Sequence, residues 1–157
     1  MNDIALCLIR DTMADTISIL HYNRNAVAIF LTSVDQFWTT GTFATRGMTL
    51  DQLRNYPSER SKWKPEDMFI DAVFSQLLVL PDADQKLVYY HSIIFEACKH
   101  SPSAVAPTLG RAIRWLFRHV DDMDLELVYR LLDWFAHHLS NFEFRWKWTE
   151  WYVGCMT

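Results

Sequence analysis

The last quarter of the chain carries a dense run of aromatic residues that limits the folds open to it. Residues 133–151 read DWFAHHLSNFEFRWKWTEW and hold four of the seven tryptophans. Each such ring can bury roughly 150–250 Å² of surface, so the run needs packing partners on several sides. Because chain ends usually fray, this loading beside the C-terminus predicts that the chain forms part of a larger packed body whose ring-rich end is poorly covered.

The remaining composition favours helices. The chain has 157 residues, a length typical of one domain, and half of them are hydrophobic. There are 4 glycines and 5 prolines, too few for an architecture of strands and tight turns. The net charge of −4 argues against bulk attraction to nucleic-acid phosphates.

Targeting and redox signals are weak. Cys7, Cys98 and Cys155 are isolated, which is typical of free thiols in a reducing compartment. No apolar stretch approaches the roughly 20 residues that a membrane-spanning helix needs. The N-terminus lacks the pattern of a signal peptide, so we expect a soluble intracellular protein.

Apolar periodicity predicts antiparallel helix pairs in one partial helical-repeat domain. The expected parts are a first pair over 1–38, a long exposed loop over 39–64, a second pair over 65–100, a third pair over 101–142 and an aromatic C-terminal segment over 143–157. Each pair would bury its apolar face only against its neighbours. The predicted fold class is therefore all-α, with antiparallel hairpins stacked as an α-α superhelix of the HEAT/ARM type.

Element boundaries follow from the same periodicity. Helices are expected over 4–22, 26–38 and 65–80, with Pro65 at a first helical position and Asp82 or Asp84 capping the next helix. A short helix is expected over 49–56. The cleanest pattern predicts one buried stripe, formed by Leu125, Val128, Leu132, Phe135, Leu139 and Phe142.

Two clusters suggest metal chemistry, and each has a plainer interpretation. Adjacent helical residues point about 100° apart, so His137 and His138 cannot easily share one ion; we expect one ring inside and one in water. Asp121, Asp122 and Asp124 resemble a magnesium-diphosphate motif, but Leu125 occupies the position of its third carboxylate. Helix capping explains that cluster better.

Basic residues form two further candidates. Arg111, Arg114 and Arg118 share one helical face, which either grips an acidic partner or is solvated and paired with nearby carboxylates. The run from Arg145 to Trp148 alternates basic and aromatic residues, a composition that can stack on bases. Burial is the stronger interpretation, either as a helical stripe of Phe144, Trp148 and Trp151 or as a strand with alternating rings.

The aromatic run resembles a segment of the large subunit of the nuclear cap-binding complex. The family pattern W-F-x-H-H-L-S-N-F-x-F-R-W-x-W-x-x-W is matched by Trp134, Phe135, His137, His138, Leu139, Ser140, Asn141, Phe142, Phe144, Arg145, Trp146, Trp148 and Trp151. Weaker agreement covers 72–77, 80–81, 96–99 and Pro102, and it fades before Lys64. The loop over 39–64 and the first residues depart from the family.

The resemblance implies a helical-hairpin solenoid like the middle domain of the four-G translation initiation scaffold. It corresponds to the first part of the second of three such domains. It also implies scaffolding rather than catalysis, without cofactor or metal. The expected partners are the small cap-binding subunit, which holds the methylated guanine, and RNA-processing, export and decay proteins in the nucleus; capped RNA would be reached only indirectly.

The candidates for partner contact or hairpin packing are His137, His138, Phe142, Phe144, Arg145, Trp146, Lys147, Trp148 and Trp151. Two other functions stay open from the residues. One is an unrelated helical-repeat adaptor with other protein partners. The other is a helical metal-dependent enzyme acting on diphosphates, which requires the acidic cluster to converge in a pocket.

Overall fold

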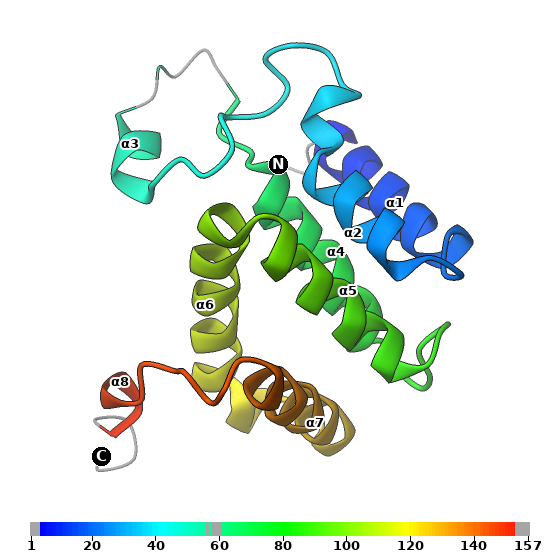
Figure 1. The fold of residues 1–157 in the computed structure, drawn as a ribbon, viewed down its shortest axis with the longest axis vertical. Helices are drawn as coiled ribbons and strands as arrows, with labels where there is room; N and C mark the ends of the chain where they lie inside the picture. Colours follow the sequence, from blue (N-terminus) through cyan, green and yellow to red (C-terminus); the bar gives the residue numbers. More distant parts are fainter. Residues whose placement is uncertain (1–3, 56, 58–60, 153–157) are drawn as a thin grey trace.

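The computed structural model describes residues 4–55, 57 and 61–152, and every regular element among them is helical (Figure 1). The α-helices are α1 (Ile4–Ile19), α2 (Arg24–Thr32), α3 (Leu50–Arg54), α4 (Pro65–Leu77), α5 (Leu87–His100), α6 (Pro102–Arg118), α7 (Leu125–Asn141) and α8 (Thr149–Tyr152). Two 3-10 turns, η1 (Val34–Gln36) and η2 (Val120–Asp122), complete the set. The predicted all-α class is confirmed.

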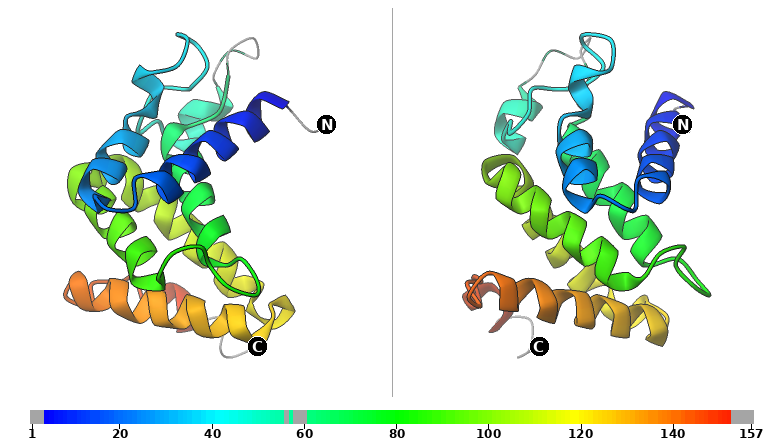
Figure 2. Two further views of the ribbon diagram at one scale, coloured as in Figure 1. Left: turned by 90° about the vertical axis from the view of Figure 1, so that its right-hand side faces the viewer. Right: turned by 45° about the vertical axis from the view of Figure 1, so that its right-hand side comes forward.

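The long helices form two rows. One row runs α1, α4, α6 and the other runs α2, α5, α7, each helix packing against the next in its row (Figures 1 and 2). The α4/α5 pair lies in the middle and contacts helices on both sides. Within the last pair, α6 and α7 have few direct contacts with each other; α7 packs mainly against α5 and crosses the lower end of the molecule in Figure 1.

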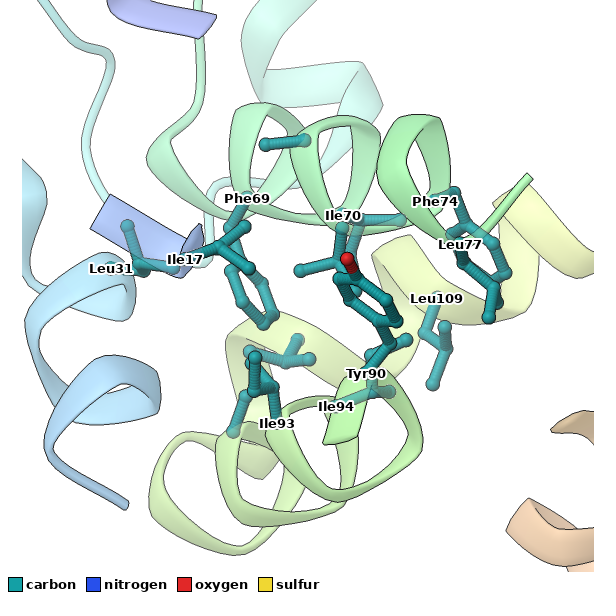
Figure 3. Close-up of a cluster of buried hydrophobic side chains, with 14 of the residues drawn as sticks. Ile17, Leu31, Phe69, Ile70, Phe74, Leu77, Tyr90, Ile93, Ile94 and Leu109 are labelled. Carbon is teal, nitrogen blue, oxygen red and sulfur yellow. The ribbon is translucent and has the colours of Figure 1, made fainter. Parts of the chain in front are cut away.

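The core is centred on α4 and α5. Phe69 and Ile70 of α4 face Tyr90, Ile93 and Ile94 of α5, with all five side chains buried (Figure 3). Ile17, Leu31 and Leu109 join from α1, α2 and α6. In α1 and α4 the apolar residues at three- and four-residue steps form the buried faces: Ile9, Met13 and Ile17 are buried, as are Met68, Phe69, Ala72, Val73 and Leu77.

Side-chain hydrogen bonds to distant backbone carbonyls connect the hairpins. Gln76 of α4 donates to the carbonyl of Ala14 at 2.8 Å, and the Tyr89 hydroxyl of α5 donates to the carbonyl of Ile17 at 2.7 Å. Both bonds reach α1 from the central pair. They fix the axial register of neighbouring helices, which apolar contacts alone leave free to slide.

The segment before α4 is more firmly held than expected. Lys64 and Glu66 are 3% and 2% exposed and form an ion pair at 3.2 Å. The backbone N–H of Gly47 donates to Glu66 Oε1 at 2.9 Å, and Lys64 Nζ donates to the carbonyl of Met48 at 3.2 Å. The expectation of a wholly exposed loop was therefore wrong for this part, because buried charges require polar partners and the loop backbone supplies them.

Several predicted boundaries were displaced. The first helix ends at Ile19, and the second ends at Thr32 and is followed by η1. Neither Asp82 nor Asp84 caps α5, because Lys86 is its N-cap residue. The short helix α3 begins as expected, since Thr49 and Gln52 form a capping box.

The buried face of α7 is also rotated from the prediction. Leu125 and Leu132 are 66% and 55% exposed, while Leu131, Trp134 and Leu139 are buried. The helix has apolar residues on both sides, and Tyr129 is exposed beside Leu125 and Leu132. The predicted stripe is confirmed at Leu139 and wrong at Leu125 and Leu132, because α5 packs against the face that carries Trp134.

Arg130 of α7 fixes the α4–α5 connection and gives a test of this packing. Its buried guanidinium donates to the carbonyls of Val79 and Pro81 at 2.8 and 2.7 Å, and to Glu126 at 2.9 Å. We expect Arg130→Leu to lower the free energy of unfolding by about 1–3 kcal/mol in urea denaturation, because these carbonyls lose a charged donor.

The exposed Arg118 of α6 provides the matched control. Arg118→Leu should change stability by no more than about 0.5 kcal/mol. Equal urea midpoints for the two variants would show that Arg130 does not hold the connection.

Candidate functional site

The aromatic run, residues 133–151, contributes an inner group of rings. Trp134 is fully buried and meets Phe74 of α4 edge-on, with ring centroids 4.9 Å apart. Its indole stacks on His138 at 5.3 Å, and Phe142 contacts both His138 at 4.7 Å and Phe95 of α5 at 5.5 Å. These rings fill the interface between α7 and the central pair.

An outer group of rings fills the space between α6 and α7. Trp151 of α8 stacks on Phe117 of α6 at 4.1 Å and on Phe135 of α7 at 5.4 Å. Trp146 meets Phe135 and Trp151 edge-on at 5.3 and 5.9 Å. One indole therefore bridges two helices that have few direct contacts with each other.

The backbone between α7 and α8 is neither helix nor strand, so both predicted forms of this segment were wrong. Glu143 and Phe144 each have φ of +56°, a left-handed conformation that disfavours side chains. The N–H groups of Phe142 and Phe144 donate to the carbonyl of Leu139 at 3.1 and 2.9 Å, which ends α7 in a Schellman-like turn. This reversal returns the chain toward α6, where Trp146 and Trp151 find their partners.

The turn leaves the residues on both sides of Trp146 on the surface. Phe144 and Trp148 are 62% and 43% exposed, and Arg145 and Lys147 are exposed between them. Arg145 forms a 2.6 Å ion pair with Glu143. The expected buried stripe therefore holds for Trp151 alone, and the region presents aromatic and basic groups to solvent.

Both histidines of the pair are half-buried, so the expectation that one would face water was wrong. The His137 ring lies 5.1 Å from His91 of α5, and His138 stacks on Trp134. Burial lowers the pKa of His91 to about 4; the nearby His137 also lowers this pKa, whereas the charge of Asp133 raises it. Burial also lowers the pKa of His138 to about 4, again assisted by His137.

Metal-ligand geometry is not assembled around these rings. Over residues 4–55, 57 and 61–152, no three His, Cys, Asp or Glu side chains converge in a way that could hold an ion. Asp121 and Asp122 lie exposed on η2, and Asp124 caps α7 by accepting from the N–H of Glu126 at 2.9 Å. The acidic cluster therefore does not form the pocket that a diphosphate enzyme requires, and its capping role is confirmed for Asp124.

A cavity of about 320 Å³ lies between the aromatic run and helices α5 and α6. Cys98 lies in its wall, and burial raises the pKa of this thiol to about 12. Its lining is mainly apolar and consists of Cys98, Pro102, Ala106, Leu109, Gly110, His138, Phe142, Arg145 and Trp146. The cavity can take an apolar side chain near a guanidinium.

The three candidate arginines of α6 do not form one open basic face. Arg111 donates to Asp67 of α4 at 2.8 Å and to Thr108 at 2.9 Å. Arg114 is half-buried, whereas Arg118 is exposed. Partner binding through this set remains a prediction.

Ring partners from distant segments were missed by sequence reasoning. Phe74, His91, Phe95 and Phe117 complete the aromatic groups, yet they lie well before the run. In the sequence, these four residues were recognisable as parts of predicted helices but not as partners of the aromatic run. None of the helices that the structure describes is both long and apolar enough to span a bilayer.

The chain matches known proteins over most of its length. A family model described as "MIF4G like" matches residues 1–155. Nuclear cap-binding protein subunit 1 of Schizosaccharomyces pombe is 43% identical over 150 residues, covering 96% of this chain and 19% of the relative. Nuclear cap-binding protein complex subunit 1 of Saccharomyces cerevisiae is 36% identical over 147 residues, covering 92% of this chain and 17% of the relative.

A plant relative agrees. Nuclear cap-binding protein subunit 1 of Arabidopsis thaliana is 43% identical over 86 residues, covering 55% of this chain and 10% of the relative. The chain thus spans about a fifth or less of the length of the curated relatives it matches. The resemblance drawn from the aromatic run is confirmed.

The buried histidines predict a dependence of stability on pH. The pKa values of His91 and His138 are about 4 in the folded chain, below the 6.5 of a free histidine. The unfolded chain therefore binds more protons, and stability present above pH 6.5 is lost as the pH falls toward 4. Each histidine can contribute up to about 1.4 kcal/mol per pH unit, measurable as urea midpoints from pH 7.5 to 4.5.

Substitution separates this effect from the titration of carboxylates. His138→Gln should make the pH dependence between 6.5 and 5 shallower, whereas His21→Gln, at an exposed position of the α1–α2 turn, should leave it unchanged. Identical slopes for wild type and His138→Gln would contradict the assignment.

The left-handed turn predicts a stabilising substitution. Glycine adopts φ of +56° without the steric cost that Glu143 carries. We expect Glu143→Gly to raise the free energy of unfolding by about 1 kcal/mol, because the exposed pair with Arg145 contributes little. In contrast, Ser140→Gly inside α7 should lower it by about 0.5–1 kcal/mol; a loss of stability in both variants would refute the turn geometry.

Proposed function

The chain belongs to the MIF4G-like family, and from that premise we propose that it acts as a scaffold segment of the large subunit of a nuclear cap-binding complex. The observation that carries this proposal is the 43% identity over 150 residues to a protein named nuclear cap-binding protein subunit 1. The role is one of binding and support rather than catalysis. Nuclear residence, with shuttling to the cytoplasm, is part of the same proposal.

The packing supports a rigid role. Two rows of helices share a core in which Phe69, Tyr90 and Ile94 are fully buried. Bonds such as that from Gln76 to Ala14 hold the register between hairpins. A body of this kind can stabilise a mobile partner in its binding-competent form, because it needs only to contact that form better than the others.

We place the candidate partner contact at the exposed part of the aromatic run. Phe144 and Trp148 offer apolar surface, and Arg145 offers a guanidinium beside them. Aromatic residues and arginine are enriched among the residues that dominate protein–protein binding energy. In this proposal Trp134, Trp146 and Trp151 pack the hairpins and do not contact the partner.

The proposed partners are the small cap-binding subunit and proteins of RNA processing, export and decay. Methylated guanine is bound by the small subunit, so this chain reaches capped RNA only through it. The burial of Trp134 supports this division, because its indole is engaged with Phe74 and His138 inside the chain.

Co-purification with the small cap-binding subunit tests the proposal. We expect the folded chain to co-elute with that subunit in size-exclusion chromatography and to show no affinity of its own for 7-methyl-GTP in fluorescence titration. Phe144→Ser together with Trp148→Ser should weaken the association at least tenfold, whereas Leu125→Ser on the exposed side of α7 should not.

The complete large subunit provides the reference. If it retains the small subunit while this folded chain does not, the segment lacks the binding surface and the proposed contact is wrong. Cap-analogue binding by the chain alone would contradict the division of roles.

A further inference from the structure

A groove of about 410 Å³ runs between α4 and α6, and none of its lining residues belongs to the aromatic run. Its floor is apolar and is formed by Ile70, Phe74 and Leu116, all at most 9% exposed. Ile70 and Phe74 are seen on α4 in Figure 3. A volume of this size is sufficient for a few side chains of a bound peptide.

Trp115 stands in the wall of this groove without a role in the core. It is 59% exposed, whereas Trp134 is fully buried. His119 stacks on its ring at 4.3 Å, and the Nδ1–H of His119 donates to the Trp115 carbonyl at 2.8 Å. One face of the indole is thus supported by His119, and an exposed tryptophan beside an apolar groove is typical of a binding hot spot.

The mouth of the groove carries two carboxylates one helical turn apart. Asp67 accepts from Thr108 and Arg111 at 2.8 Å each and is held by them across the groove. Asp71 pairs with Arg10 of α1 at 3.2 Å, with both side chains about half exposed. An ion pair this exposed contributes little, so an incoming cation can replace Arg10 at small cost.

We propose that this groove binds an arginine-bearing segment of a partner protein. The guanidinium would stack on Trp115 and pair with Asp71, while an adjacent leucine-like side chain would cover Ile70 and Phe74. Arginine is favoured over lysine because its planar group stacks on rings and pairs with carboxylates through two donors. The apolar floor favours a peptide side chain over a nucleotide phosphate, and because Asp67 is already paired with Arg111, Asp71 is the carboxylate that an incoming cation meets. This site goes beyond the proposed function and does not involve the small cap-binding subunit.

Nuclear magnetic resonance on the isotopically labelled chain tests the site with a blocked peptide of sequence Ser-Gly-Leu-Arg-Leu-Gly-Ser. We expect shifts confined to α4, α6 and the Trp115 indole N–H. Trp115→Ala and Asp71→Asn should each raise the dissociation constant of the peptide about three- to tenfold. Tyr129→Ala and Asp82→Asn, at exposed positions outside the groove, should leave it unchanged.

Variant peptides test whether binding requires the charge of the arginine. Replacing the arginine with citrulline keeps its shape without its charge and should weaken binding by a similar factor; equal binding would overturn the proposal. Shifts outside the groove, or a loss of affinity with Tyr129→Ala as large as that with Trp115→Ala, would also overturn it. So would a single-stranded oligonucleotide that perturbs the groove more strongly than the peptide. Trp115 and Asp71 are exposed, so unchanged thermal melting of both variants will separate lost binding from lost folding.

Discussion

Burial of α4 on nearly all sides is the constraint on which the rest of the structure depends. Nine of its thirteen residues are buried, and they contact α1, α2, α5 and α6. A helix with so little solvent-facing surface cannot fold alone, because its apolar sides are stabilised only when its neighbours cover them. Folding of the hairpins is therefore coupled through one central element. The buried pair of Lys64 and Glu66 extends this coupling to the preceding loop, whose backbone groups solvate the two charges.

The sequence was sufficient for the fold class and for the buried faces of α1 and α4. In α1 one set of apolar residues dominates, and in α4 the apolar residues form a wide stripe that agrees with burial on nearly all sides. The prediction was only partly right in α7: Leu139 is buried as predicted, but Leu125 and Leu132 are exposed because the position of α5 places Leu131 and Trp134 in the core instead. It failed between α7 and α8. The turn formed by Glu143 and Phe144 at positive φ contains no glycine, so the sequence does not indicate it. The tertiary contacts of Trp146 and Trp151 stabilise this turn.

The candidate site shows how a distinctive motif can combine two roles. Residues that carry the family resemblance divide between rings that join helices, such as Trp134 and Trp151, and side chains that face solvent, such as Phe144 and Trp148. Identity alone does not separate the two groups, since both consist of the same residue types. Burial and ring geometry separate the two groups, and they identify the exposed residues as the candidates for partner contact. The α4–α6 groove was not suggested by any motif, because Asp71 and Trp115 come from helices that are adjacent only in the folded chain.

The position of Cys98 has a consequence for the chemical reactivity of the chain. Its thiol lies in the cavity wall beside α6 and stays protonated at neutral pH, whereas Cys7 is exposed on α1. Since only the thiolate is nucleophilic, an alkylating reagent can reach Cys98 in reactive form only when α5 and α6 separate. The rate of its modification is thus a direct readout of local opening beneath the aromatic run, with Cys7 as the internal standard for the unhindered reaction.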